Sequence, residues 1–286
     1  MYFCDMMKLQ TPVTLDPAPV SVSYGDPILV LGSCFADEIG RRLSEAGFRV
    51  LTNPFGTLYN PVSIGNAIAR LSSGVTFTEE DVVEMGAGAG RMCSFWHHTS
   101  FARDTAEEFL ENANRSLEEA AAFWKDCNKV IVTLGTAWAF RHNGTGETVA
   151  NCLKRPAAEF TRYRLTVAQT SAILQGLVQR NSGKEFIFTV SPIRHLADGA
   201  HGNQLSKSSL LLATEGLPYF PAYEIMMDEL RDYRWWAEDM VHPAPHAAAY
   251  LCDRFMEWAL PIREWDLYES KMKEWRHTRH RPLYSE

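Results

Sequence analysis

The chain has 286 residues, of which 28 are basic and 35 acidic, so its formal net charge is −7. Hydrophobic residues make up 46% of the chain, an ordinary share for a folded protein that can bury a sizeable core. The acidic balance argues against a nucleic-acid binder, and no apolar run reaches the roughly 18 residues that a membrane span needs.

The amino-terminal end and the cysteines indicate a cellular compartment. Residues 1–10 contain no basic segment followed by an apolar one, so we expect no export signal. The six cysteines include no CxxC pair, which argues against a zinc finger and favours reduced thiols. We therefore expect a cytoplasmic protein.

Short apolar runs alternate with longer segments of helical spacing along the chain. The pattern predicts, in chain order, a strand over 27–31, a helix over 35–46, a strand over 48–51, a helix over 105–126, a strand over 129–134, a helix over 164–181, a strand over 185–190, a helix over 203–214, a strand over 219–223 and a helix from Pro243. Strands separated by helices imply βαβ units. The expected fold is an α/β three-layer α/β/α sandwich with a mostly parallel sheet.

The stretch 261–286 departs from this alternation. From Lys271 onward it has five basic and two acidic residues, a net charge of +3, with aromatic side chains between them. Such a mixture also occurs in RNA-binding segments, but nothing else in the chain supports nucleic-acid binding. We therefore expect one domain over 1–260, and an extension over 261–286 that packs on it or trails from it.

Ser33 is the first candidate catalytic residue. It stands where the first predicted strand gives way to a helix, and the carboxyl ends of parallel strands gather functional groups. Backbone amides at the helix start can face a developing oxyanion. The alternative is that Ser33 only caps the helix. Cys34 is an alternative nucleophile, although a free cysteine packs well as a small buried residue.

Asp239 and His242 are the second candidate pair. They are three residues apart, directly before Pro243, so one turn can place the carboxylate beside the imidazole. An imidazole can take the proton of a serine hydroxyl, and a carboxylate fixes its tautomer. The alternative is a surface pair near a helix start.

Gly32-Ser33-Cys34-Phe35-Ala36 is the signature that names the GSCFA family, and the chain resembles this family over most of its length. Further blocks of the resemblance follow in order at 53–61, 133–136, 191–195 and 219–242. The family is a relative of the SGNH/GDSL hydrolases. The resemblance therefore implies a flavodoxin-like parallel sheet with the nucleophile after the first strand.

The resemblance also implies residue roles. Ser33 is similar to the nucleophile of those hydrolases, His242 to the base and Asp239 to the third member of the triad. Gly56 matches the glycine whose amide joins that of the nucleophile in the oxyanion hole. The third hydrolase block normally carries an asparagine donor, whereas this chain has Ala137.

The missing asparagine needs a replacement, because the loss of one hydrogen-bond donor from an oxyanion hole lowers the catalytic rate by about 10²–10³-fold. Thr136 and Asn60 are the candidates for that role. Gly56 has an alternative interpretation as a turn glycine with a positive backbone angle.

Histidines supply a further group of candidates. His97, His98, His195 and His201 would allow metal-assisted hydrolysis if they converged, since imidazole suits zinc or iron. We favour pocket-wall or structural roles. Arg194 and His195 follow a strand, so we expect them at the substrate-binding rim together with His98, where Arg194 would bind an anionic or hydroxyl-rich substrate.

These observations predict a serine hydrolase of the SGNH type, an esterase or deacylase acting on an acylated small molecule or carbohydrate. It would need no cofactor and no metal, and would bind neither nucleic acid nor membrane. A non-catalytic carbohydrate- or ligand-binding protein on the same fold is the alternative.

Overall fold

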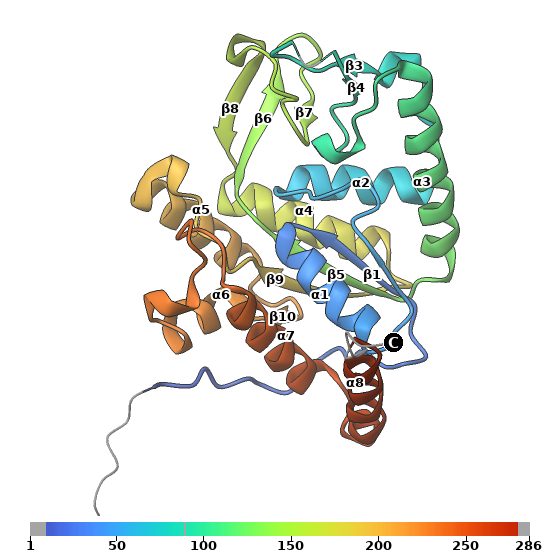
Figure 1. Ribbon diagram of the computed structural model, residues 1–286. Helices are drawn as coiled ribbons and strands as arrows, with labels where there is room; N and C mark the ends of the chain where they lie inside the picture. The colour runs from blue at the N-terminus through green and yellow to red at the C-terminus, as the bar shows by residue number, and fades with distance from the viewer. Residues whose placement is uncertain (1–9, 89, 280–286) are drawn as a thin grey trace, which may run out of the picture.

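A computed structural model describes residues 10–88 and 90–279. Within these residues, five parallel strands form the central sheet in the order β10-β9-β5-β1-β2. They are β1 (Ile28–Gly32), β2 (Val50–Thr52), β5 (Lys129–Leu134), β9 (Glu185–Val190) and β10 (Tyr219–Phe220). Helices lie on both sides of this sheet (Figure 1), which confirms the predicted α/β/α sandwich.

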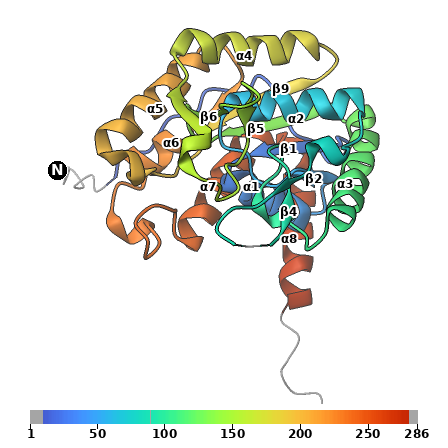
Figure 2. The same ribbon diagram turned by 90° about the horizontal axis from the view of Figure 1, so that it is seen from above.

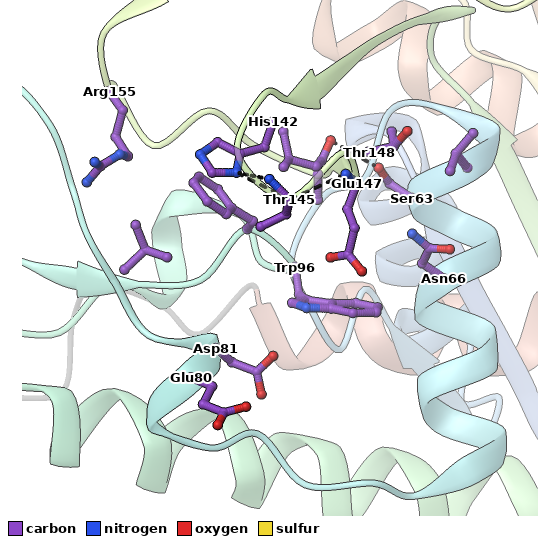
Figure 3. A pocket seen from close by; sticks show the side chains of 15 residues that line it. Ser63, Asn66, Glu80, Asp81, Trp96, His142, Thr145, Glu147, Thr148 and Arg155 are labelled. Carbon is purple, nitrogen blue, oxygen red and sulfur yellow. Dashed lines mark hydrogen bonds between the residues drawn. The ribbon is translucent and has the colours of Figure 1, made fainter. Parts of the chain in front are cut away.

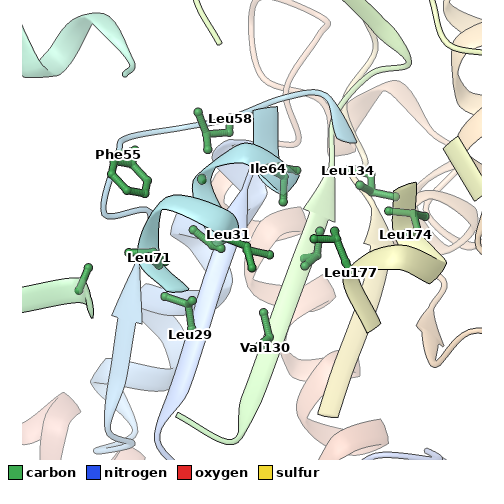
Figure 4. Close-up of a cluster of buried hydrophobic side chains, with 14 of the residues drawn as sticks. Leu29, Leu31, Phe55, Leu58, Ile64, Leu71, Val130, Leu134, Leu174 and Leu177 are labelled. Carbon is green, nitrogen blue, oxygen red and sulfur yellow. The ribbon is translucent and has the colours of Figure 1, made fainter. Parts of the chain in front are cut away.

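The two faces of the sheet bury separate hydrophobic clusters, because successive strand side chains point to opposite sides. Leu29 and Leu31 pack with the helices above the sheet in Figure 1, and Figure 4 shows this cluster. These helices are α2 (Pro61–Ser73), α3 (Ala106–Asp126), α4 (Val167–Arg180) and α5 (Gly199–Ala213). Ile28 and Val30 pack with α1 (Cys34–Glu45), α7 (Pro245–Ala259) and α8 (Trp265–Arg279) on the other face.

Smaller elements stand outside the sandwich. An antiparallel sheet of β6 (Trp138–His142), β7 (Thr148–Val149) and β8 (Phe160–Arg164) lies near the pair β3 (Val83–Glu84) and β4 (Met92–Cys93), above α2 in Figure 1 and seen from above in Figure 2. Short helical turns occupy Glu79–Asp81, Thr99–Phe101, Ala157–Glu159, Leu196–Asp198, Tyr233–Trp235 and Ile262–Glu264. The short α6 (Ala222–Glu224) runs into a π-helical turn, Ile225–Glu229.

The described part of the carboxy-terminal stretch packs on the sandwich. Tyr268 and Met272 of α8 are buried in the same cluster as α1 and α7. Residues 280–286, which belong to the predicted extension, lie outside the described residues. Across residues 10–88 and 90–279, no helix is both long and apolar enough to span a membrane.

Candidate functional site

The turn from β1 into α1 depends on a glycine. Gly32 has a φ of +134°, and a Cβ atom there would lie 2.1 Å from the Thr133 carbonyl oxygen on β5. Only glycine allows this approach. The Asn53 side chain holds the turn, because its Oδ1 accepts from the Gly32 N–H at 2.9 Å and its Nδ2 donates to Asp37 at 2.7 Å.

Ser33 acts as the cap of α1. Its hydroxyl is buried, accepts from the Phe35 N–H at 3.3 Å and lies 3.0 Å from the Thr133 hydroxyl. Ser33 and His242 both belong to the described part of the chain, and no hydrogen bond joins them. The hydrogen bond expected between a Ser33 nucleophile and its base is therefore not formed, and the hydroxyl instead contacts the Phe35 N–H and the Thr133 hydroxyl.

The predicted pairing of Asp239 with His242 is present. His242 Nδ1 lies 2.6 Å from Asp239 Oδ2, and Asp239 Oδ1 accepts from the backbone N–H groups of His242 at 3.0 Å and Val241 at 2.9 Å. These bonds, led by the His242 backbone N–H, lower the pKa of Asp239 to about 2. An ionised Asp239 keeps the proton on Nδ1, so Nε2 is left as the proton acceptor.

Arg194 forms hydrogen bonds to the turn that contains Asp239 and His242. Its backbone N–H donates to the Val241 carbonyl at 3.1 Å and its Nη2 to the Met240 carbonyl at 2.8 Å. Its guanidinium also lies over the Trp236 ring, 4.3 Å from the centroid. These contacts position the loop of His242, and the expectation that Arg194 binds substrate stays a prediction.

Cys34 shares a pocket with His242. The pocket has a volume of about 200 Å³, and its walls come from the start of α1, from Ile193 and from the start of α7. The lining residues are Cys34, Phe35, Glu38, Arg41, Ile193, His242, Pro243, Pro245 and Ala248. Cys34 is the first residue of α1 and is partly exposed, whereas Ser33 does not line this pocket. Of the two candidate nucleophiles, Cys34 is the one that lines the same pocket as His242.

The charge state of Cys34 reflects opposing effects. Burial, and then the nearby Asp37 carboxylate, raise the pKa of Cys34 to about 11, so the thiol keeps its proton at neutral pH. The first amides of α1 and the Lys207 ammonium act in the other direction. A helix N-terminus and a cation both stabilise a thiolate once it forms. The thiol therefore needs a base, and then has groups that stabilise its anion.

Lys207 is a buried cation that sequence reasoning missed. Its side chain is 1% exposed, and Nζ donates to the carbonyl oxygens of Gly135 and Ser191, each at 2.8 Å. These carbonyls follow β5 and β9, so the ammonium lies at the carboxyl edge of the sheet. Burial lowers the pKa of Lys207 to about 7, and Cys34 is the group that opposes this shift. The only sequence signal is a lysine inside an otherwise Ser- and Leu-rich helix.

The amides expected in an oxyanion hole are used elsewhere. The Gly56 N–H donates to the Asn53 carbonyl at 2.8 Å within a turn, and Gly56 has a φ of +76°. The Ser33 N–H donates to the Thr133 carbonyl at 3.1 Å. Gly56 is thus the turn glycine of the alternative interpretation, and its expected role as an oxyanion donor is corrected.

The two side-chain replacements for the missing asparagine are also occupied. Asn60 caps α2, where its Oδ1 accepts from the Ser63 N–H at 2.9 Å. The Thr136 hydroxyl lies 3.0 Å from the Ser206 hydroxyl, and the Thr136 backbone N–H donates to the Tyr59 carbonyl at 2.9 Å. Helix capping and loop closure therefore take both groups away from the role expected of them.

His195 interacts electrostatically with Lys207 and His242 but is not among the residues that line the Cys34 pocket. Its ring is 6.4 Å from that of Tyr59, and its backbone N–H donates to the Asn203 side chain at 2.9 Å. Burial, followed by the charges of Lys207 and, more weakly, His242, lowers the pKa of His195 to about 4. The imidazole of His195 is therefore neutral at pH 7. His98 instead caps a short turn, with Nδ1 accepting from the Ser100 N–H at 3.2 Å.

The histidines of the alternative metal set do not converge. His97 is enclosed by phenylalanine rings, with Nδ1 2.6 Å from the Ser94 hydroxyl, and burial lowers its pKa to about 3. His201 is exposed on α5. Among the described residues, no group of three or more His, Cys, Asp or Glu side chains is arranged to hold a metal ion. The metal site considered from sequence is therefore not assembled.

The GSCFA family matches residues 27–255, a range that contains Cys34, Lys207, Asp239 and His242. No curated protein matches the chain.

Proposed function

The chain belongs to the GSCFA family, and from this premise we propose that it is an acyl hydrolase with Cys34, His242 and Asp239 as its triad. The observation that carries the proposal is the single pocket lined by the Cys34 thiol and by an imidazole whose Nδ1 is bound to a carboxylate. A nucleophile, a base and a group that orients the base are the parts that covalent catalysis requires. The resemblance to SGNH/GDSL hydrolases supports the same reaction class.

The reaction proceeds in two acyl transfers. His242 Nε2 takes the thiol proton as the Cys34 sulfur attacks the ester carbonyl, and the tetrahedral intermediate expels the alcohol with that proton. Water, deprotonated by His242, then attacks the thioester and releases the carboxylic acid and the thiol. Asp239 stabilises the imidazolium in both steps because its low pKa keeps it ionised.

Lys207 supplies charge stabilisation in this scheme. Two of its N–H bonds are directed to backbone carbonyls, and a protonated amine has a third. The ammonium, together with the Cys34 and Phe35 amides, opposes the effect of burial on the thiol. A buried cation of this kind is suited to the negative charge that an asparagine donor would otherwise stabilise.

The pocket favours a small acyl group. At about 200 Å³ it is smaller than sites for whole drug-sized ligands, which measure roughly 300–1,000 Å³. We propose that the acyl chain of an acylated small molecule or carbohydrate enters it, while the alcohol portion stays outside near His195.

Hydrolysis of p-nitrophenyl acetate by cysteine variants tests the proposal. Cys34→Ala is expected to lose at least about 10³-fold in kcat/KM, because the acyl-enzyme cannot form. Cys152→Ala is the matched control, since that cysteine is also partly exposed but lies outside the pocket. Equal rates in the two variants would contradict the proposal.

A non-catalytic ligand-binding protein is the second candidate. The observation that favours it is the use of the Gly56 and Ser33 amides in a turn and in the sheet. In that case the wild-type protein would hydrolyse p-nitrophenyl acetate no faster than Cys34→Ala.

A further inference from the structure

A second cavity lies on the far side of α2 from Cys34. It has a volume of about 620 Å³ and is bounded by α2, by the β6–β7 hairpin and by the segment leading to β3. It shares no lining residue with the Cys34 pocket. Figure 3 shows Trp96, Asn66 and Glu147 turned into this space from three different segments.

Trp96 forms an aromatic surface of the cavity. The Arg70 guanidinium covers one side of the ring, 5.2 Å from its centroid, and Phe77 meets the ring at 6.3 Å. In Figure 3 the ring lies across the cavity with the Glu147 carboxylate above it. These contacts fix the ring orientation and leave an aromatic surface opposite a carboxylate.

The unneutralised charges around the cavity are negative. Asp81 pairs with Arg70 at 3.2 Å, and Arg155 pairs with Glu159 at 2.6 Å. For Glu147 and Glu80, which are both exposed, the described part of the chain shows no side-chain hydrogen bond or ion pair. The cavity therefore has two uncompensated carboxylates, while its one lining arginine is already neutralised.

We propose that this cavity binds an organic cation, with its alkylammonium group between the Trp96 ring and the Glu147 carboxylate. An aromatic face attracts a cation through its quadrupole, and a carboxylate within a few ångströms adds a direct charge interaction. The Asn66 amide, which projects from α2, can accept a hydrogen bond from the rest of the ligand. The charge balance disfavours phosphorylated or carboxylated ligands.

The test compares a cation with its neutral isostere. Calorimetric titration of the full-length chain at low salt uses choline and 3,3-dimethylbutan-1-ol, which have nearly the same shape but differ in charge. We expect choline to bind and the neutral alcohol to bind at least about fivefold more weakly, the ratio expected of a cation–π contact at an exposed site. Equal binding of the two, or no binding of choline, would overturn the proposal.

Variants locate the binding. Glu147→Gln and Trp96→Leu are each expected to weaken choline binding about fivefold, whereas Glu269→Gln, on α8 at the opposite end of the molecule (Figure 1), leaves it unchanged. Glu147 is exposed, so its glutamine variant decides the matter even if Trp96→Leu fails to fold. Equal weakening by Glu269→Gln, or binding of a neutral oligosaccharide in place of choline, would contradict a cation site. The readout is binding alone, so it is independent of the acyl hydrolase proposal.

Discussion

Replacing Ser33 with alanine separates its structural role from catalysis. The change removes the cap of α1, which costs about 1 kcal/mol in helices generally. It also removes the described partner of the Thr133 hydroxyl, which is wholly buried, and a buried polar group without a partner costs about 1–3 kcal/mol. The expected loss in the free energy of unfolding is therefore about 2–4 kcal/mol.

Urea denaturation measures this loss, and Thr105→Ala is its matched control. Thr105 caps α3 through the Glu108 N–H at 3.2 Å, but it is exposed and leaves no buried hydroxyl behind. Thr105→Ala should lower the free energy of unfolding by about 1 kcal/mol. The difference between its loss and that of Ser33→Ala then measures the contribution of the buried Thr133 hydroxyl. Both proteins should hydrolyse p-nitrophenyl acetate at the wild-type rate under native conditions.

Two results would refute this reasoning. Equal stability of Ser33→Ala and wild type would show that the buried hydrogen bond to Thr133 contributes nothing. A folded Ser33→Ala protein that had lost hydrolysis would return the nucleophile to Ser33.

Three further predictions concern charge. Asp239→Asn is expected to lower kcat by about 10³–10⁴-fold with little change in stability, since it removes the carboxylate that orients His242. Steady-state kinetics measures kcat and thermal melts measure stability. A variant with the wild-type kcat would contradict this prediction. Burial lowers the pKa of Lys207 to about 7, so its ammonium is half deprotonated near that pH and mostly neutral well above it. The rate of hydrolysis should therefore decline above pH 7 in the wild type, and Lys207→Met should lack this decline. Burial lowers the pKa of His97 from 6.5 to about 3, so the unfolded state binds the proton first and stability falls as pH drops below 6.5. Urea unfolding at pH 5 should show a free energy of unfolding about 2 kcal/mol below the value at neutral pH. His97→Gln should lack this loss.

The sandwich could be predicted because its elements are periodic. The strand 129–134 is mostly apolar and buried along its whole length, and α3 and α4 repeat their apolar residues at helical spacing. Helix α2 was missed because its cap, Asn60, follows closely on the turn-rich stretch 53–56, where no periodic signal marks a helix start. The strands of the second, antiparallel sheet are too short or too polar to show alternation.

The proposed site differs from the sequence prediction by one residue, Cys34 in place of Ser33, and keeps Asp239 and His242. Asp239 and His242 could be found because they lie three residues apart, so a single turn brings their side chains together. The choice between Ser33 and Cys34 depends on which of them caps α1, and both residue types suit the end of a strand. Lys207 could not be found because its partners are backbone carbonyls of distant loops, which leave no mark in the sequence.

The central claim is that an acyl group is carried on the Cys34 sulfur. Wild-type protein mixed with p-nitrophenyl acetate and quenched in acid should gain one acetyl group, which tandem mass spectrometry assigns to Cys34 and which neutral hydroxylamine removes as it does a thioester. Ser33→Ala should give the same adduct and Cys34→Ala none. An acetyl group found on Ser33, or one that survives in Cys34→Ala, would contradict the account.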